Sequence, residues 1–139
     1  MMKSSKGLTV SAIALSAFIG SSALAHHSGA MWDRTKIVEY KGTIMGFEYQ
    51  VPHPWIRIMT TFNGKQQEFD IEAASVNVLH SVDVTPQTLK PGDKVTVHVH
   101  PIRDGRPAGD LSDITLANGR FVSIEKAQEK RKPGGQAPG

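Results

Sequence analysis

The sequence predicts a mainly β protein: a small five- to six-stranded OB-like barrel with one short helix, preceded by a cleaved signal peptide. Residues 36–121 are rich in β-branched and aromatic residues, with apolar and polar positions alternating as in strands that bury one face. Turn signals containing glycine divide this region into short segments. The expected order is three strands, a short helix, then two or three strands, as in an OB-type barrel. A fragment of a β-sandwich is the alternative.

The first predicted strand is long, and its apolar residues change parity along its length. The apolar positions are Val38, Tyr40 and Ile44 on one face, then Met45, Phe47 and Tyr49 on the other. A strand alternates faces with period two, so this change requires an irregularity. Gly42 and Gly46 predict a bulge that moves the buried set from one face to the other.

Turn signals place the remaining elements. Asn63 and Gly64 both tolerate positive φ and predict a hairpin between "PWIRIMTTF" and "QQEFDIE". The spacing of apolar residues in "AASVNVLHS" predicts the short helix. The later strands are "DKVTVHVHPI", "DLSDITL" and "RFVSI", separated by turns at Asp104–Gly105 and Asn118–Gly119.

The chain divides into four segments, beginning with a secretory signal at residues 1–25. Lys3 and Lys6 precede an apolar run that ends at Ala23-Leu24-Ala25, a sequence typical of signal peptidase cleavage after Ala25. A leader at 26–35, the barrel domain at 36–125 and a disordered tail at 126–139 are expected to follow. The apolar run is too short to span a bilayer, and no transmembrane segment is expected after cleavage. These features predict a periplasmic protein.

Composition narrows the range of partners. Between residues 26 and 125 the chain has ten Lys and Arg against twelve Asp and Glu, so its basic excess lies in the signal and the tail. A nucleic-acid-binding domain is expected to carry a basic surface on its folded body, so no nucleic-acid partner is predicted. The absence of cysteine excludes disulfides, thiol chemistry and cysteine-ligated metals.

Cleavage after Ala25 would turn His26 into a candidate chelate. The new α-amine and the imidazole of His26 titrate near neutral pH, and His27 adds a second imidazole. With one more imidazole these groups form the nitrogen-rich set that copper(II) favours. The predicted metal ligands are therefore His26, His27 and His53, and copper is the predicted cofactor.

His53 is the candidate third ligand because it lies between Pro52 and Pro54, which stiffen the segment. A stiff loop suits a ligand. It equally suits a structural histidine that is hydrogen-bonded to a carbonyl beside Trp55, and this alternative stays open. Trp32 is expected to pack on the barrel and to hold the leader against it.

The other titratable residues are expected to have structural roles. His98 and His100 share one face of a predicted strand, where a solvated or cross-strand-paired role is favoured, and His80 near the helix end is assigned none. Glu68, Asp70 and Glu72 are interpreted as a solvated edge. The sequence has no hydrolase, phosphate-loop or metalloprotease motif, so no catalytic residue is assigned and a non-enzymatic role is favoured.

Several stretches in order resemble a family of small exported bacterial proteins, domain of unknown function family 6152. They are "AHHSGAMWD", "VEYKGTIMGFEYQVPHPWIRI" and "LKPGDKVTVHVHPIRDGRP". The resemblance covers His26 to Phe121. The matching positions are His26, His27, Ser28, Asp33, Gly42, Thr43, Pro52, His53, Trp55, Lys90, Pro91, Gly92, Asp93, Asp104 and Gly105. Val51 and Gly29 depart from the usual asparagine and aromatic residue. The resemblance implies a small exported β-barrel domain and carries no established activity.

Two functions follow as hypotheses. The first is a periplasmic protein that carries, buffers or senses a copper-like ion through its processed N-terminus. The second is a metal-free module that binds a ligand or an envelope protein. Its contact surface would be formed by Phe47, Tyr49, Trp55 and the face of His98 and His100. The oligomeric state stays open.

Overall fold

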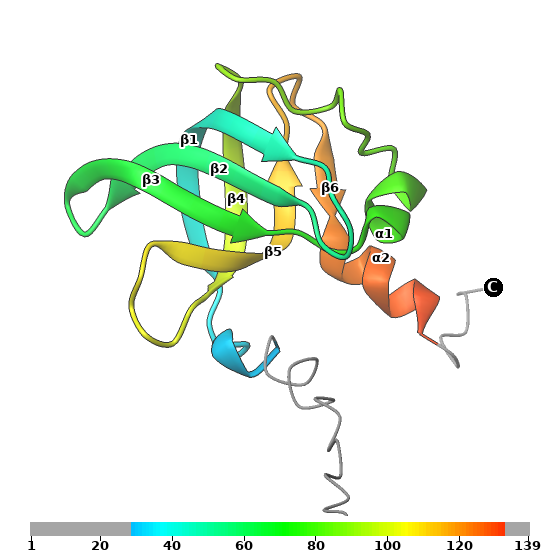
Figure 1. Cartoon of the computed structure of the whole chain (residues 1–139), viewed down its shortest axis with the longest axis horizontal. Coiled ribbons are helices and arrows are strands. Elements are labelled where there is room, and N and C mark those ends of the chain that lie inside the picture. The colour runs from blue at the N-terminus through cyan, green and yellow to red at the C-terminus, as the bar shows by residue number, and fades with distance from the viewer. Residues whose placement is uncertain (1–28, 133–139) are drawn as a thin grey trace, which may run out of the picture.

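The computed structural model describes residues 29–132, which form a single six-stranded sheet that closes on itself (Figure 1). The strands are β1 (Val38–Glu48), β2 (Trp55–Phe62), β3 (Lys65–Glu72), β4 (Lys94–Pro101), β5 (Ala108–Thr115) and β6 (Phe121–Ser123). The helices are η1 (Gly29–Met31), α1 (Val76–Ser81) and α2 (Ile124–Arg131). In Figure 1, α1 and α2 lie together at one end of the barrel, while η1 lies below the β4–β5 hairpin.

The strand order is that of an OB-type barrel. The sheet runs β3-β2-β1-β4-β5-β6 with antiparallel neighbours, and β3 also pairs in parallel with β5. That parallel pairing sets Asp70 opposite Ala108 and Glu72 opposite Asp110, and it closes five strands into a barrel. β6 pairs with β5 and lies outside the closed ring. The predicted fold class, a mainly β OB-like barrel of five to six strands, is confirmed.

The long first strand contains the predicted irregularity. The register between β1 and β2 shifts between Ile44 and Gly46, so Met45 is the additional residue of a bulge. Gly42 is needed for a different reason. A Cβ at this position would lie 2.8 Å from the carbonyl oxygen of Met59 on the neighbouring strand. The two glycines therefore let β1 pair with β4 in its first half and with β2 in its second half.

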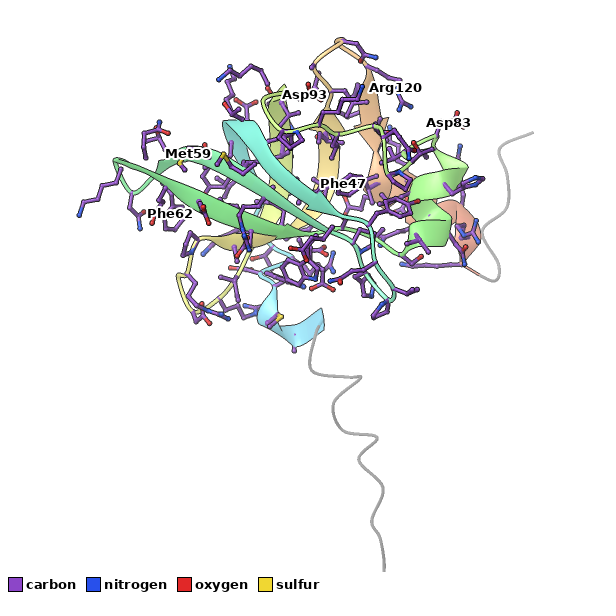
Figure 2. The ribbon with its side chains drawn as sticks, turned by 45° about the horizontal axis from the view of Figure 1, so that its top comes forward. Phe47, Met59, Phe62, Asp83, Asp93 and Arg120 are labelled. Atoms are coloured by element: carbon purple, nitrogen blue, oxygen red, sulfur yellow. The ribbon has the colours of Figure 1, made fainter. Side chains whose placement is uncertain are left out.

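The hairpin between β2 and β3 also forms at the predicted position. Asn63 and Gly64 both have positive φ, at 50° and 75°, as a tight hairpin turn requires. Figure 2 shows Met59 and Phe62 toward this turn, at the end of the barrel away from Asp83 and α1.

The core fills the barrel with side chains from all five closed strands and from both α-helices. Its fully buried members include Ile44, Ile58, Phe69, Ile71, Leu79, Val97, Val99, Ile114 and Ile124. α1 contributes Val78 and Leu79, whereas its first residue, Val76, is half-buried. The helix covers the end of the barrel between β3 and β4, as its place in the sequence predicts.

A second helix occupies part of the segment that was expected to be a disordered tail. The prediction of disorder from residue 126 is wrong for residues 126–131, which belong to α2. The Ser123 side chain accepts a hydrogen bond from the Lys126 amide, and Glu125 lies in the first turn. Ile124 and Ala127 are buried against the core, so tertiary packing stabilises a helix that is polar elsewhere. Residues 133–139 lie outside the described residues, as does the predicted signal peptide, 1–25.

Candidate functional site

His53 lies in the loop between β1 and β2 and is fixed to the segment that follows β3. Its Nδ1 donates to the carbonyl oxygen of Ala73 at 3.1 Å, and the Ala73 amide donates to the Pro54 carbonyl at 2.9 Å. Pro54 is fully buried, which anchors the loop. The His53 side chain is 41% exposed, and no hydrogen bond within residues 29–132 engages its Nε2. The loop therefore orients the ring through one nitrogen and leaves the other for a further partner.

Two largely buried carboxylates lie near this histidine. The Glu72 Oε1 is 3.9 Å from the His53 Nδ1, and Glu72 is the register partner of Asp110 in the pairing of β3 with β5. Burial raises the pKa of both carboxyl groups, although the charges of His53 and Arg34 act in the opposite direction. The expectation that Glu72 belongs to a solvated edge is wrong. Glu72 does not lie at an edge, because the last three residues of β3 pair with β5 and this pairing closes the barrel.

The described part of the leader packs across the same end of the barrel. Trp32 is only 2% exposed and forms an isolated bridge with Ile102, next to the bond from the Asp33 amide to the Pro101 carbonyl at 2.8 Å. The Arg34 Nη1 lies 2.7 Å from the Asp110 Oδ2. The predicted role of Trp32 is confirmed. It holds the leader on the barrel, and Arg34 connects the leader to the carboxylates near His53.

Asp33 shapes the start of the strand that follows the leader. Its Oδ1 accepts hydrogen bonds from the Thr35 hydroxyl at 2.6 Å and from the Thr35 amide at 3.2 Å. The hydroxyl of Thr35, and then Lys36, lower the pKa of Asp33 to about 2. This carboxylate therefore stays ionised well into the acid range and closes a small turn between η1 and β1.

The three predicted metal ligands are not all within the described residues. His53 is described, whereas His26 and His27 lie before residue 29. Within residues 29–132, no three or more His, Asp or Glu side chains lie close enough together to hold a metal ion.

His98 and His100 share a strand but not an environment. His98 is paired across strands, with its Nδ1 2.5 Å from Asp113 and its Nε2 3.3 Å from Glu39. His100 is 2% exposed; its Nδ1 donates to the Lys36 carbonyl at 2.7 Å, and its Nε2 lies 3.3 Å from Glu125. The cross-strand role is confirmed for His98. The expectation of solvation is wrong for His100, because the leader and α2 cover that end of β4.

The aromatic residues considered as a joint contact surface lie in two places. Phe47 and Tyr49 pack edge to face at the rim of the core, with their ring centroids 5.4 Å apart. Figure 2 shows Phe47 near the middle of the barrel. The Tyr49 hydroxyl lies 3.3 Å and 3.2 Å from the carbonyls of Val76 and Val84, next to α1. Trp55 instead lines a groove on the outer side of the sheet. The histidines of β4 belong to neither place.

Three charged residues at this end of the barrel, Arg34, Asp110 and Glu125, were not predicted from the sequence. Asp110 meets Glu72 through a parallel pairing between distant strands, which no local pattern predicts. Glu125 meets His100 through α2. A local signal did exist for that helix, because Ser123 can cap it and Ile124 and Ala127 are spaced to share one helical face.

Comparisons with known proteins bear on the family to which the chain belongs. A family model described as "Family of unknown function (DUF6152)" matches residues 14–111. No curated protein matches the chain. Within the described residues, none of the helices combines the length and the apolar character needed to cross a membrane.

Similar solved structures include a protein in complex with a transfer RNA and a single-stranded DNA binding protein. One is TiaS in complex with a transfer RNA and ATP, at 17% identity and a TM-score of 0.45, with 58% of this chain aligned to 18% of that one. Another is Rim1, a mitochondrial single-stranded DNA binding protein from S. cerevisiae, at 14% identity and a TM-score of 0.45. The alignment with Rim1 covers 58% of this chain and 92% of that one.

Proposed function

The chain belongs to the DUF6152 family, a family of unknown function, and from this premise we propose that it is an exported protein that holds a copper-like ion. Export to the periplasm would end with cleavage after Ala25. The metal would be held by the α-amine and ring of His26, by His27 and by His53. Carriage, buffering or sensing of the metal is the role that such a site suits.

One observation carries the proposal: the hydrogen bonding of the His53 ring. Metal-binding histidines almost always donate their second ring nitrogen to a carbonyl or carboxylate, which fixes the tautomer and the ring orientation. His53 makes this bond from Nδ1 to Ala73, on a half-exposed ring, so that Nε2 has the lone pair a metal requires. The same bond supports the structural alternative, and metal titration separates the two.

The attachment of the leader supports the proposal by limiting how far the chain end can be from His53. Trp32 is buried, and Arg34 pairs with Asp110, which lies across the β3–β5 pairing from Glu72 beside His53. Trp32 is six positions after His26, a span of at most about 20 Å for a fully extended chain. The tether therefore keeps the proposed N-terminal ligands at high effective concentration around the barrel end.

The chemistry of the donors selects the ion. An amine with imidazole ligands suits copper(II), whereas oxygen-preferring magnesium and calcium need carboxylates and carbonyls. Glu72 adds negative charge near His53, which favours a cation there, while the charge of Asp110 is matched by Arg34.

Two measurements test the proposal. Intact-mass spectrometry of the exported protein should show a chain that begins at His26. Calorimetric titration of that protein with copper(II) should then show one tight site. Adding one alanine before His26, or substituting His53→Ala, should each weaken the affinity by about 10- to 100-fold or more, the scale for losing a group that supports a metal.

His80→Ala is the matched control, because His80 is an exposed imidazole at the end of α1 with no assigned role. It should leave copper affinity unchanged. Equal affinity in the extended protein would refute the role of the α-amine. Unchanged affinity in His53→Ala would return His53 to a structural role in its loop.

A further inference from the structure

A groove on the outer side of β1, β2 and β3 is separate from the proposed metal site. It has a volume of about 440 Å³, and the lining side chains that bear on its chemistry are Met45, Glu48, Trp55, Arg57, Glu68 and Asp70. This volume is within the range of ligand pockets, which is roughly 300 to 1,000 Å³. It is large enough for one or two side chains of a partner.

The groove exists because of the bulge in β1. The bulge at Met45 offsets the pairing with β2 and sets Gly46 opposite Arg57. A Cβ built on Gly46 would have no atom within 4 Å, so the missing side chain leaves open space. Met45 itself is 45% exposed and forms an apolar border.

The lining is acidic. Arg57 Nε lies 2.8 Å from Asp70 Oδ1 and 3.6 Å from Glu68 Oε2, so one guanidinium faces two carboxylates. The carboxylates of Asp70, Glu68 and Glu48 all raise the pKa of Arg57. Glu48 is therefore a third negative charge near this guanidinium. Three carboxylates and one guanidinium line the groove, which leaves it with a net negative charge.

Trp55 adds an aromatic surface to this negative charge. It precedes Ile56, whose side chain points into the core, so Trp55 points to the outer side of the sheet. Glu48 on β1 and Glu72 on β3 are its register partners on either side. Aromatic faces and carboxylates both attract ammonium and guanidinium groups, whereas a phosphate backbone would be repelled.

We propose that this groove binds an extended basic segment of a partner protein, with an arginine or lysine side chain over Trp55 and among the groove carboxylates. Charge complementarity selects the partner. The exposed Met45 beside the groove suits an apolar residue that alternates with the basic ones. Neither His53 nor the leader lines the groove, so the two sites can be tested separately, although Glu72 lies between them, beside His53 and opposite Trp55.

Tryptophan fluorescence of the full chain provides the test. Trp55 lines the groove, while Trp32 is buried and gives a constant background. A blocked hexapeptide that alternates arginine with valine should change the emission in a saturable way that weakens with added salt. The matched glutamate–valine peptide should not bind.

Two variants locate the binding in the groove. A Cβ at Gly46 would meet no atom within 4 Å, so Gly46→Leu should place its side chain in the open groove and abolish peptide binding, while the protein stays folded and keeps its copper titration. Glu48→Gln should weaken binding about fivefold, the loss expected for one exposed ion pair. Glu129→Gln, on α2, is the control and should bind as the unmodified protein does.

Three results would overturn the proposal. They are equal binding of the acidic peptide, undiminished binding by Gly46→Leu, and emission changes produced by a neutral oligosaccharide but not by the basic peptide. The last result would assign the groove to sugars.

Discussion

Two regions of the outer surface use the same residue types in opposite ways. On the covered side, residues 29–36 and α2 pack on the barrel. Trp32 and His100 are buried there, and the polar groups around them are paired. On the groove side, around Trp55 and Arg57, an aromatic ring and charged groups line an open hollow. The difference teaches that residue type does not decide between structure and binding. What decides is whether another segment of the chain packs on top.

The largest expected effect comes from removing the tryptophan of each region. Trp32→Ala should lower the free energy of unfolding by about 3–5 kcal/mol, because it removes a fully buried ring. Trp55→Ala should cost clearly less, since its ring is half-exposed. Urea unfolding of both variants measures the contrast, and similar losses would show that the covered side is no more tightly packed than the groove side.

Gly109, which precedes Asp110 of the covered side, and Gly46 of the groove provide the second contrast. A Cβ at Gly109 would lie 2.7 Å from the Val99 Cγ2, whereas one at Gly46 would meet nothing within 4 Å. Gly109→Ala should therefore destabilise the protein by about 1–3 kcal/mol through overpacking. Gly46→Ala should stay within about 0.5 kcal/mol of the unmodified protein. Thermal and urea unfolding should agree on this order, and a reversed order would contradict the packing described for β5.

Substituting the two histidines of β4 sharpens the comparison within one strand. His100→Ala should cost about 1–2 kcal/mol, because it leaves the Lys36 carbonyl without its buried donor. It should also speed hydrogen exchange in α2, which is joined to His100 through Glu125. His98→Ala, at a partly exposed position, should cost less than about 1 kcal/mol. Unchanged exchange in α2 would mean that His100 does not fasten that helix.

The smallest effect is a pH-dependent one at Asp33. Its folded-state pKa of about 2 is below the ordinary 3.8, so its ionised form stabilises the fold fully above pH 4 and progressively less down to pH 2. The difference in Tm between the unmodified protein and Asp33→Asn should therefore shrink as the pH falls through that interval. Thr35→Val should remove much of the same difference, because the Thr35 hydroxyl contributes most to the lowered pKa. A Tm difference that does not vary with pH would contradict this.

Local patterns predicted much of the barrel. Asn63 and Gly64 form the predicted hairpin turn. Met45 forms the bulge in β1 where the apolar positions change parity, and Trp32 holds the leader on the barrel. These features depend on backbone dihedrals, period and size, which are properties of neighbouring residues. Such features can therefore be predicted from the local sequence.

The polar arrangement of the covered side was not predictable in this way. Asp110 meets Arg34 across 76 positions of sequence and meets Glu72 through closure of the barrel. Such contacts arise when distant segments pack, and single residues carry no signal for them. At the proposed metal site, the prolines on either side of His53 are a local signal, whereas the bond from His53 to the Ala73 carbonyl joins positions 20 apart and has none.

Closure of the sheet through β3 and β5 also governs how copies of this protein meet one another. β6 has a neighbour on one side only and is three residues long, and β3 pairs with β5 only over residues 70–72, so residues 65–69 stay open on that side. A longer open strand would offer a row of unused amide and carbonyl groups on which another chain could add. The open rows that closure leaves within residues 29–132, at β6 and at residues 65–69, are short, and the second is rich in charged and polar side chains, so this part of the chain offers little for strand-by-strand aggregation.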